Sequence, residues 1–429
     1  MRTTISFYTF GCRLNQSETA VVRRTFEADK RYKIVDFKTP ADIVVVNTCT
    51  VTENGDADTR QLVNKINRNN PSARIALIGC QAQIQKNKLT ELANVRWVIG
   101  NARKTDFHSI LKETKDREKP CVITPAIPRD SFTVPIAGID RSHTRANLKI
   151  QDGCDFFCSF CEIPYARGRA RSRAFEDIVL EARALAEAGH KEVIITGINV
   201  GTYKNQNKNV VDVVDALEQI TELKRIRISS IEPTTVPTGL IKKMAKHTKL
   251  CRHLHLPLQC GSDTILKAMR RKYSADEFGN FVRQAHDTVP GICIGTDVIA
   301  GFPGEAEEQF QETTDRLREW PINYFHIFSY SQRSMAQSQK LPKAVAKHDI
   351  AVRSKILREL GLRKRHVFYQ SLLETQQPVL FEQRKNGYWT GLTDNYARVK
   401  IKSDRPLANQ FLNVRLTQID HQAIIGAID

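Results

Sequence analysis

The stretch Gly153-Cys154-Asp155-Phe156-Phe157-Cys158-Ser159-Phe160-Cys161 places three cysteines in a CxxxCxxC pattern directly after a strand-like segment, residues 147–151. Thiolates this close in sequence can turn toward one centre without help from distant parts of the chain. Zinc sites usually close with four ligands, and no nearby Cys or His completes a tetrahedron here. The spacing therefore predicts an iron–sulfur cube with one iron left open to a small ligand. The alternative is three unrelated buried thiols.

Length and composition limit the class of protein. A chain of 429 residues has room for two or three domains, each with its own core. Ten cysteines are too sparse for a secreted disulfide scaffold, and no apolar signal segment or membrane-spanning run is present, so we expect a cytoplasmic protein without membrane insertion. The net charge of +18 suggests a nucleic acid partner, although a basic solvated surface would also account for it.

The first hundred residues alternate strand-like and helix-like segments, which predicts a doubly wound parallel sheet. The expected strands are residues 5–10, 43–47, 74–79 and 95–100, with helices at 16–28 and 57–69. Cys12, Cys49 and Cys80 each follow one of these strands. Because the carboxyl ends of parallel strands share one edge, we expect these cysteines to converge there and hold a second cluster. Alternatively, each is a small buried residue that ends its strand.

The middle of the chain predicts an incomplete parallel barrel of six strand and helix repeats. Its expected strands are residues 148–152, 192–196, 225–229, 253–256, 294–299 and 324–328, and its expected helices are 175–188, 211–221, 263–270, 275–289 and 305–319. Active sites of such barrels lie at the carboxyl ends of the strands, and the CxxxCxxC loop follows the first strand. We expect cofactor contacts near these ends from Tyr165, Gly197, Asn199, Ser230, Glu232, Gln259, Asp297 and Phe328.

Two basic regions are candidate RNA contacts. Arg167, Arg169, Arg171 and Arg173 alternate with small residues after the cysteine loop, which suggests a phosphate track or, alternatively, a solvated basic turn. After a basic helical region at 350–365, five strand-like segments at 378–381, 387–392, 397–401, 410–416 and 423–427 predict a small barrel. Within it Tyr388, Trp389, Arg398 and Lys400 combine aromatic rings with positive charge, as base-stacking surfaces do, or alternatively belong to a plain barrel core with an exposed basic rim.

The cysteine stretch resembles the signature of radical S-adenosylmethionine enzymes. Together with the three earlier cysteines and the terminal barrel, it resembles the methylthiotransferase family over essentially the full chain. The motifs at Thr9–Gln16 (TFGCRLNQ), Ser229–Pro233 (SSIEP) and His253–Gln259 (HLHLPLQ) are most similar to the branch that acts on N6-threonylcarbamoyladenosine in tRNA. Two positions depart from the family pattern: Cys260 replaces a usual Ser, and Gln332 replaces a usual Pro.

The resemblance implies an α/β protein with four segments. These are a methylthiotransferase domain at 1–115, a linker at 116–143, a (β/α)6 radical barrel with a following helix at 144–370, and an OB-like TRAM domain that binds RNA at 371–429.

It also implies two 4Fe-4S clusters. Cys154, Cys158 and Cys161 would hold the cluster that cleaves S-adenosylmethionine, and Cys12, Cys49 and Cys80 the auxiliary cluster.

The implied reaction inserts a methylthio group at carbon 2 of the modified adenosine at position 37, beside the anticodon. A 5'-deoxyadenosyl radical removes the hydrogen, and a reductase or flavodoxin supplies electrons to a monomeric enzyme. Arg167 or Arg169 would read the threonyl carboxylate. The alternatives are the same chemistry on isopentenyl-adenosine tRNA or on a ribosomal protein aspartate, and a non-catalytic iron–sulfur protein that binds RNA or carries electrons.

Overall fold

The computed structural model describes residues 2–50, 53–135, 144–246 and 248–428. The chain divides into two compact units. The first unit is Met1–Asp140 with Lys149–Asp177 and Ser331–Gln339, and the second is Arg141–Leu148 with Ile178–Tyr330 and Lys340–Asp429. The cysteine loop therefore belongs to the same unit as the N-terminal sheet.

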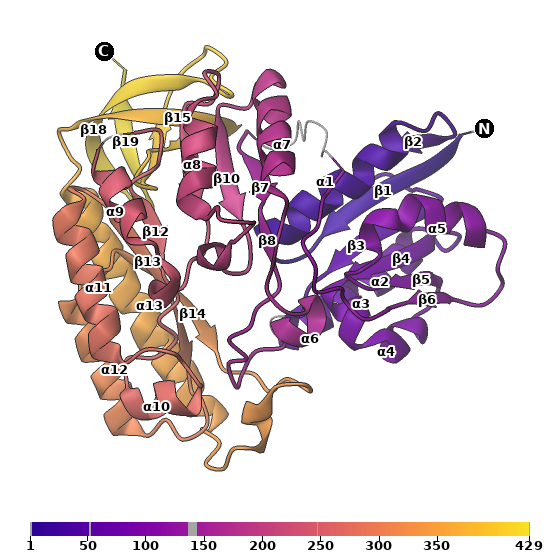
Figure 1. Cartoon of the computed structure of the whole chain (residues 1–429), viewed down its shortest axis with the longest axis horizontal. Helices are drawn as coiled ribbons and strands as arrows, with labels where there is room; N and C mark the ends of the chain where they lie inside the picture. Colours follow the sequence, from indigo (N-terminus) through magenta and orange to yellow (C-terminus); the bar gives the residue numbers. More distant parts are fainter. Residues whose placement is uncertain (1, 51–52, 136–143, 247, 429) are drawn as a thin grey trace. The chain divides into compact units, whose positions relative to one another are not determined.

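The first unit is built on a six-stranded parallel sheet in the order β2-β1-β3-β4-β5-β6 (Figure 1). The strands are β1 (Thr3–Thr9), β2 (Tyr32–Ile34), β3 (Ile43–Thr48), β4 (Arg74–Gly79), β5 (Val95–Ile99) and β6 (Cys121–Ile123). The helices are α1 (Arg13–Glu27), α2 (Glu53–Asn69), α3 (Cys80–Ile84), α4 (Lys86–Thr90), η1 (Lys104–Asp106) and α5 (Phe107–Thr114). The four predicted strands and two predicted helices are all present.

Alternate residues of the central strands face two separate cores, as a doubly wound sheet requires. Ile43 and Val45 of β3 pack with residues of α1 and α5, whereas Val44 and Val46 pack with residues of α2 and α4. The short strands β2 and β6 were not predicted. Because β6 pairs with β5, residues 121–123 are part of the sheet rather than of the predicted linker at 116–143, of which residues 136–143 lie outside the described chain.

The cysteine loop of the first unit is framed by short elements. They are β8 (Gln151–Asp152), α6 (Ile163–Arg167) and β9 (Arg171–Ser172), and β8 pairs with β9 in an antiparallel ribbon. The predicted strand at 148–152 is therefore split between β7 (Ala146–Lys149) and β8.

The second unit contains the six repeats of the predicted barrel. The strands form two three-stranded sheets, β11-β10-β7 and β12-β13-β14, and isolated parallel bridges from Ile226 to Leu250 and from Ser230 to His255 connect β11 to the second sheet. The strands are β10 (Glu192–Thr196), β11 (Arg225–Ile228), β12 (His253–His255), β13 (Cys293–Ala300) and β14 (Tyr324–Ser329).

Helices alternate with these strands. They are α7 (Phe175–Glu187), η2 (Val200–Thr202), α8 (Val210–Glu218), η3 (Pro233–Thr235), α9 (Thr238–Ala245), α10 (Asp263–Ala268), α11 (Ala275–Thr288) and α12 (Glu307–Glu319). The short η4 (Gln337–Lys340) follows β14 and lies mostly in the segment Ser331–Gln339 of the first unit. Capping boxes start two of them: Asn209 with Asp212 opens α8, and Ser274 with Glu277 opens α11. Each box satisfies backbone N–H groups that the first helical turn leaves without partners.

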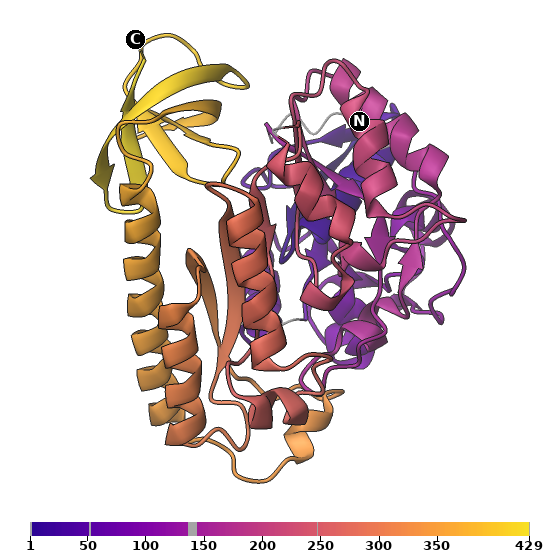
Figure 2. The ribbon, with the colours of Figure 1, turned by 60° about the vertical axis from the view of Figure 1, so that its left-hand side comes forward.

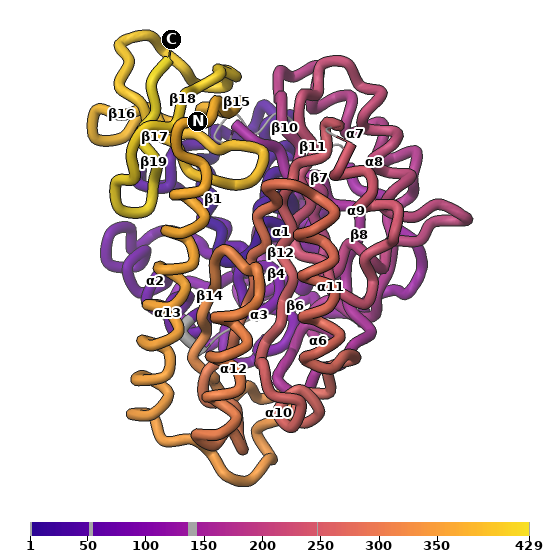
Figure 3. The backbone as a smooth tube through the Cα atoms, turned by 90° about the vertical axis from the view of Figure 1, so that its left-hand side faces the viewer, coloured from indigo at the N-terminus to yellow at the C-terminus, as the bar shows by residue number. Residues whose placement is uncertain are grey.

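The C-terminal strands close a small barrel in the order β15-β16-β17-β19-β18 (Figure 3). They are β15 (Gln376–Lys385), β16 (Tyr388–Leu392), β17 (Arg398–Ile401), β18 (Phe411–Asp420) and β19 (Ala423–Ala427). The long helix α13 (Lys347–Gln370) leads into this barrel, as Figure 2 shows, and Phe368 and Tyr369 at its end join the barrel core.

Trp389 corrects one prediction. Its side chain is only 9% exposed and packs in the barrel core, so it is not a base-stacking surface. Tyr388, the preceding residue, is half-buried and lies under the ammonium groups of Lys400 and Lys402. Among the described residues, no helix is both long and apolar enough to span a bilayer.

We predict that Trp389→Ala lowers the midpoint of thermal unfolding, because removal of a buried Trp costs about 3–5 kcal/mol. Tyr388→Ala is the matched control, since neighbouring strand residues face opposite sides. Thermal unfolding followed by circular dichroism measures both variants. Equal loss in the two variants would contradict the core position of Trp389.

Candidate active site

Cys12, Cys49 and Cys80 lie at the carboxyl edge of three neighbouring strands. In the sheet β1 lies beside β3 and β3 beside β4. Thr48 and Gly79 are register partners, so Cys49 and Cys80 are the next residues along paired strands. Cys12 precedes α1, three residues after Thr9, which pairs with Asn47. The sequence prediction that these cysteines converge at one edge is confirmed for their backbone positions.

Two glycines let the chain pass close to these thiols. Gly11 has φ +88°, and a Cβ at this position would lie 2.7 Å from Sγ of Cys49. Gly79 has φ +100°, and a Cβ there would lie 2.9 Å from the carbonyl oxygen of Thr48. A side chain at either position would combine an unfavourable backbone conformation with a steric clash. The glycines therefore permit Cys49 to lie against the segment that carries Cys12.

The CxxxCxxC loop folds locally, as its spacing suggests. The backbone N–H of Phe156 donates to Sγ of Cys154, and that of Ile163 donates to Sγ of Cys161, both at 3.5 Å. Thiols that accept backbone N–H groups fit the ligand set of an iron–sulfur cluster, because such hydrogen bonds stabilise sulfur ligands that carry negative charge.

Three contacts join the segment after this loop to the edge that carries the other cysteines. Arg167 donates to Oδ1 of Asn15 at 2.6 Å, near Cys12. Thr50, which follows Cys49, donates to Oε2 of Glu162 at 3.2 Å. Asn101 donates to Ala166 O at 2.7 Å and contacts Sγ of Cys80 at 3.5 Å. Cys12 and Cys49 are thus connected to α6 or to the residue before it through residues close to them in sequence, and Cys80 through the side chain of Asn101.

A buried charge cluster also connects the segment after the cysteine loop to the N-terminal domain. It is formed by Glu18, Lys104, Lys149, Asp152 and Arg167. Arg167 donates to Glu18 and Asp152 at 3.0 Å, and Lys149 donates to both carboxylates at 2.7 Å. Lys104 also pairs with Glu18.

Burial alone would raise the pKa of Glu18 and of Asp152, but the neighbouring cations outweigh burial and hold both pKa values below their ordinary range. Both carboxylates therefore stay ionised.

The guanidinium of Arg167 also interacts electrostatically with the thiol groups of Cys80 and Cys12. Burial would lower its pKa, but the negative charges of Cys80, Glu18, Asp152 and Cys12 raise it well above its ordinary value.

Glu162, directly after Cys161, is a second junction that sequence reasoning missed. Its carboxylate accepts hydrogen bonds from Arg333 at 3.0 Å and from the backbone N–H of Met335 at 2.8 Å. Arg333 also pairs with Asp56 at 2.8 Å and donates to Thr50 at 2.5 Å. The sequence does show a Glu directly after the last cysteine of the loop, which could have indicated this contact. Its partner Arg333, however, lies far along the chain.

The predicted phosphate track is wrong for two of its four arginines. The side chains of Arg167 and Arg173 are fully buried, and Arg173 pairs with Asp177 at 2.6 Å. Neither can reach a substrate carboxylate or a phosphate. Arg171 is mostly buried beside Asp152, whereas Arg169 is half exposed and lies over the Phe157 ring. Arg169 alone among the four keeps an accessible guanidinium.

The expected cofactor contacts of the second unit do lie near the carboxyl ends of its strands. Gly197 and Asn199 follow β10, Ser230 and Glu232 follow β11, Gln259 follows β12, and Asp297 and Phe328 lie within β13 and β14.

Several of these side chains already have partners. Glu232 pairs with Arg271, and Oδ1 of Asn199 accepts from the backbone N–H of Glu232. Asp297 contacts two histidines. Tyr165 belongs to the first unit, where it packs edge-on against Phe157.

The extra thiol of Cys260 is buried, and Oγ1 of Thr313 lies 3.3 Å from its sulfur. Burial raises the pKa of Cys260 to about 12, and it does the same for Cys251. A thiol that stays protonated is a poor nucleophile and a poor metal ligand. These cysteines act as small core residues, as do the buried Cys121 and Cys293.

We predict that Arg167→Met destabilises the first unit by about 3–5 kcal/mol, because it leaves Glu18 and Asp152 buried without their shared partner. The matched control is Arg169→Met, which removes a half-exposed pair with Asp155 and a contact over the Phe157 ring, and should cost about 1 kcal/mol. Chemical unfolding of both variants measures the difference. Equal costs would show that the buried cluster does not hold the two segments together.

Comparison with known proteins identifies the family. Residues 148–317 match the radical SAM superfamily, and residues 4–100 match the family described as uncharacterized protein family UPF0004. A threonylcarbamoyladenosine tRNA methylthiotransferase of Aquifex aeolicus is 37% identical, with 92% of this chain and 96% of the relative covered. A tRNA-2-methylthio-N(6)-dimethylallyladenosine synthase of Thermodesulfovibrio yellowstonii is 32% identical over 98% and 97%.

Among solved structures, the radical S-adenosylmethionine methyltransferase TsrM of Kitasatospora setae has the same fold. Its TM-score is 0.56 at 13% identity, with 76% of this chain and 73% of that chain covered. The likeness in sequence to the curated relatives extends over nearly the whole of both chains. The chain is therefore an enzyme of the methylthiotransferase family within the radical S-adenosylmethionine superfamily.

Proposed function

We propose that this enzyme inserts a methylthio group at carbon 2 of N6-threonylcarbamoyladenosine beside the anticodon of tRNA. The observation that carries the proposal is the arrangement of the first unit. Two groups of three cysteines belong to this unit, and buried polar contacts connect the segments that carry them. Methylthio transfer needs a radical generator and a sulfur donor that reach one carbon atom, so their supports must be fixed relative to each other.

The residues present fit two iron–sulfur clusters. Backbone N–H groups donate to the sulfurs of Cys154 and Cys161. Cys12 and Cys80 lie near the positive charge of Arg167. Cys154, Cys158 and Cys161 would hold the cluster that, with S-adenosylmethionine, would supply a carbon radical, and Cys12, Cys49 and Cys80 would hold the cluster that would supply methylated sulfur. The protein holds the supports, orders the loops and excludes water.

S-adenosylmethionine contacts are proposed for Tyr165 and for the strand-end residues of the second unit. The proposal rests on the rule that ligands bind at the carboxyl ends of barrel strands. The strand-end residues proposed for these contacts are Gly197, Asn199, Ser230, Glu232, Gln259, Asp297 and Phe328.

RNA binding is supported by the net charge of +18 and by the basic surface of the small barrel. Arg398 is exposed, and Lys400 and Lys402 lie over the ring of Tyr388. Such surfaces hold phosphates and stack unpaired bases. Arg169 is the remaining candidate of the predicted phosphate track.

The choice between the two modified adenosines of tRNA rests on the sequence identity to relatives that are named for each. The Aquifex aeolicus relative is named for threonylcarbamoyladenosine, and its 37% identity exceeds the 32% of the relative named for dimethylallyladenosine. The second of these supports isopentenyl-adenosine tRNA as the alternative substrate. The electron donor would be a reductase or a flavodoxin.

Nucleoside mass spectrometry tests the substrate. We expect tRNA from cells that lack this gene to lose 2-methylthio-N6-threonylcarbamoyladenosine and to accumulate the precursor without the methylthio group. The wild-type gene should restore the product, whereas Cys154→Ala should not. Loss of 2-methylthio-isopentenyladenosine instead would assign the alternative substrate, and unchanged tRNA nucleosides would reject tRNA methylthiolation.

We predict that Cys49→Ala abolishes methylthiolation but keeps cleavage of S-adenosylmethionine, because only the sulfur-donating cluster loses a ligand. The anaerobically reconstituted variant should contain about half the iron of the wild type. Production of 5'-deoxyadenosine after reduction and iron content are the measurements. Cys154→Ala serves as the contrast, since it should lose cleavage as well. Loss of cleavage in Cys49→Ala would mean that the first three cysteines only support the fold.

A further inference from the structure

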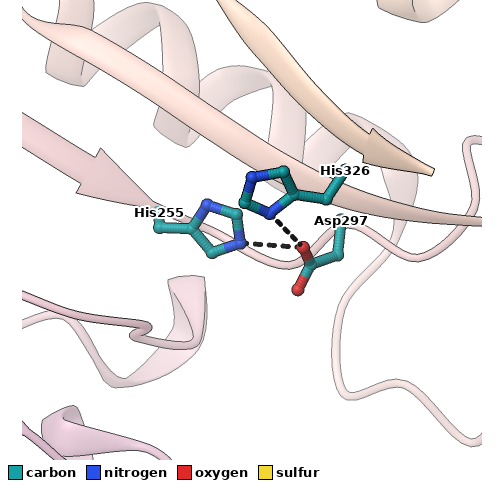
Figure 4. Close-up of side chains that lie close together, drawn as sticks. All are labelled: His255, Asp297 and His326. Atoms are coloured by element: carbon teal, nitrogen blue, oxygen red, sulfur yellow. Dashed lines mark hydrogen bonds and ion pairs between the residues drawn. The ribbon is translucent and has the colours of Figure 1, made fainter. Parts of the chain in front are cut away.

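A cluster of two histidines and one carboxylate lies in the second unit, away from the cysteines in sequence. Figure 4 shows that His255 and His326 both point toward the carboxylate of Asp297. Nε2 of His255 lies 2.9 Å from Oδ1 of Asp297, and Nδ1 of His326 lies 3.3 Å from the same oxygen. The three ligand atoms are within 4.8 Å of one another. From these positions we propose that the cluster binds a divalent transition metal ion such as Zn²⁺.

The strands bring the three side chains to one face. Asp297 of β13 and His326 of β14 are direct register partners. His255 of β12 pairs with Gly295, which lies two residues before Asp297 and therefore on the same side of β13. Gly295 leaves room above β13 for the ring of Tyr324, whose atoms a Cβ would overlap. The ligand face is thus set by backbone pairing rather than by flexible loops.

The spacing of the ligand atoms suits a metal ion. With Zn–N and Zn–O bonds of about 2.0–2.1 Å, neighbouring ligand atoms of a tetrahedral site lie about 3.3 Å apart. The contacts of 2.9 and 3.3 Å are close to this edge length. One carboxylate and two imidazoles are ligands that Zn²⁺ and Fe²⁺ accept.

A second layer of contacts orients His255. Its Nδ1 lies 3.2 Å from the hydroxyl oxygen of Tyr324, and that oxygen lies 2.9 Å from Nε2 of His253. When Nε2 of His255 binds the ion, its Nδ1–H donates to Tyr324, and the Tyr324 hydroxyl donates to His253. Metal-bound histidines characteristically have such a partner on the second ring nitrogen.

The site would be open. The side chain of His326 is 53% exposed and that of Asp297 is 21% exposed. With three protein ligands, the ion keeps at least one position for water or for an oxygen atom of a substrate. This openness distinguishes the cluster from a closed structural site.

Zinc binding to the reconstituted holoenzyme tests the proposal. Wild-type enzyme with filled iron–sulfur clusters is mixed with Zn²⁺ and desalted, and retained zinc is measured by mass spectrometry. We expect about one zinc ion per chain. His326→Ala and Asp297→Asn should weaken zinc binding at least about tenfold.

His286→Ala is the matched control. His286 lies 3.2 Å from Asp287 and is 52% exposed, but no third ligand joins that pair among the described residues. It should retain zinc as the wild type does. X-ray absorption at the zinc edge should give only nitrogen and oxygen neighbours.

Three outcomes would overturn the metal site. They are no retained zinc in the wild type, equal retention in His326→Ala and wild type, or sulfur neighbours at about 2.3 Å, which would place the ion on cysteines. None of these results depends on methylthio transfer, so they separate the metal site from the proposed function.

Discussion

The first unit depends on the buried hydrogen bonds and ion pairs that the Arg167 side chain makes. Its guanidinium joins Asn15 and Glu18 of α1 to Asp152 of the cysteine loop, in an environment without solvent. Pairing a buried cation with two carboxylates is costly unless every donor finds good geometry. The arrangement fixes the position of α1 relative to Asp152, although the two lie far apart in sequence. The two-cluster chemistry that we propose would require that fixed relation more than it would require extra stability.

Much of the fold follows from local sequence patterns. β4 and β10 match their predicted bounds, because buried runs such as Ile194-Ile195 are typical of parallel strands. Short strand-like segments separated by turn residues predicted the five strands of the terminal barrel. β2 and β6 escaped prediction because each has only three residues and lies at an edge of the sheet, where few apolar positions mark it.

The candidate site was predictable in part. The positions of all six cysteines followed from spacing and from the rule on strand ends, whereas the roles of charged residues did not. Arg167 and Arg173 look like surface residues because they alternate with small residues in a basic run. Their carboxylate partners Glu18, Asp152 and Asp177 include a residue well over a hundred positions away, as the contact of Arg167 with Glu18 illustrates. No local pattern reveals such a partner.

The interleaving of the two units has a consequence for synthesis of the protein. Ser331–Gln339 belongs to the first unit and supplies Arg333, the partner of Glu162 beside Cys161. Nascent chains emerge from the ribosome amino end first, and domains generally fold as units. The N-terminal sheet can form early, but the anchor of the cysteine loop is translated only after most of the second unit. The contact between Glu162 and Arg333 can therefore form only after about three quarters of the chain has been translated.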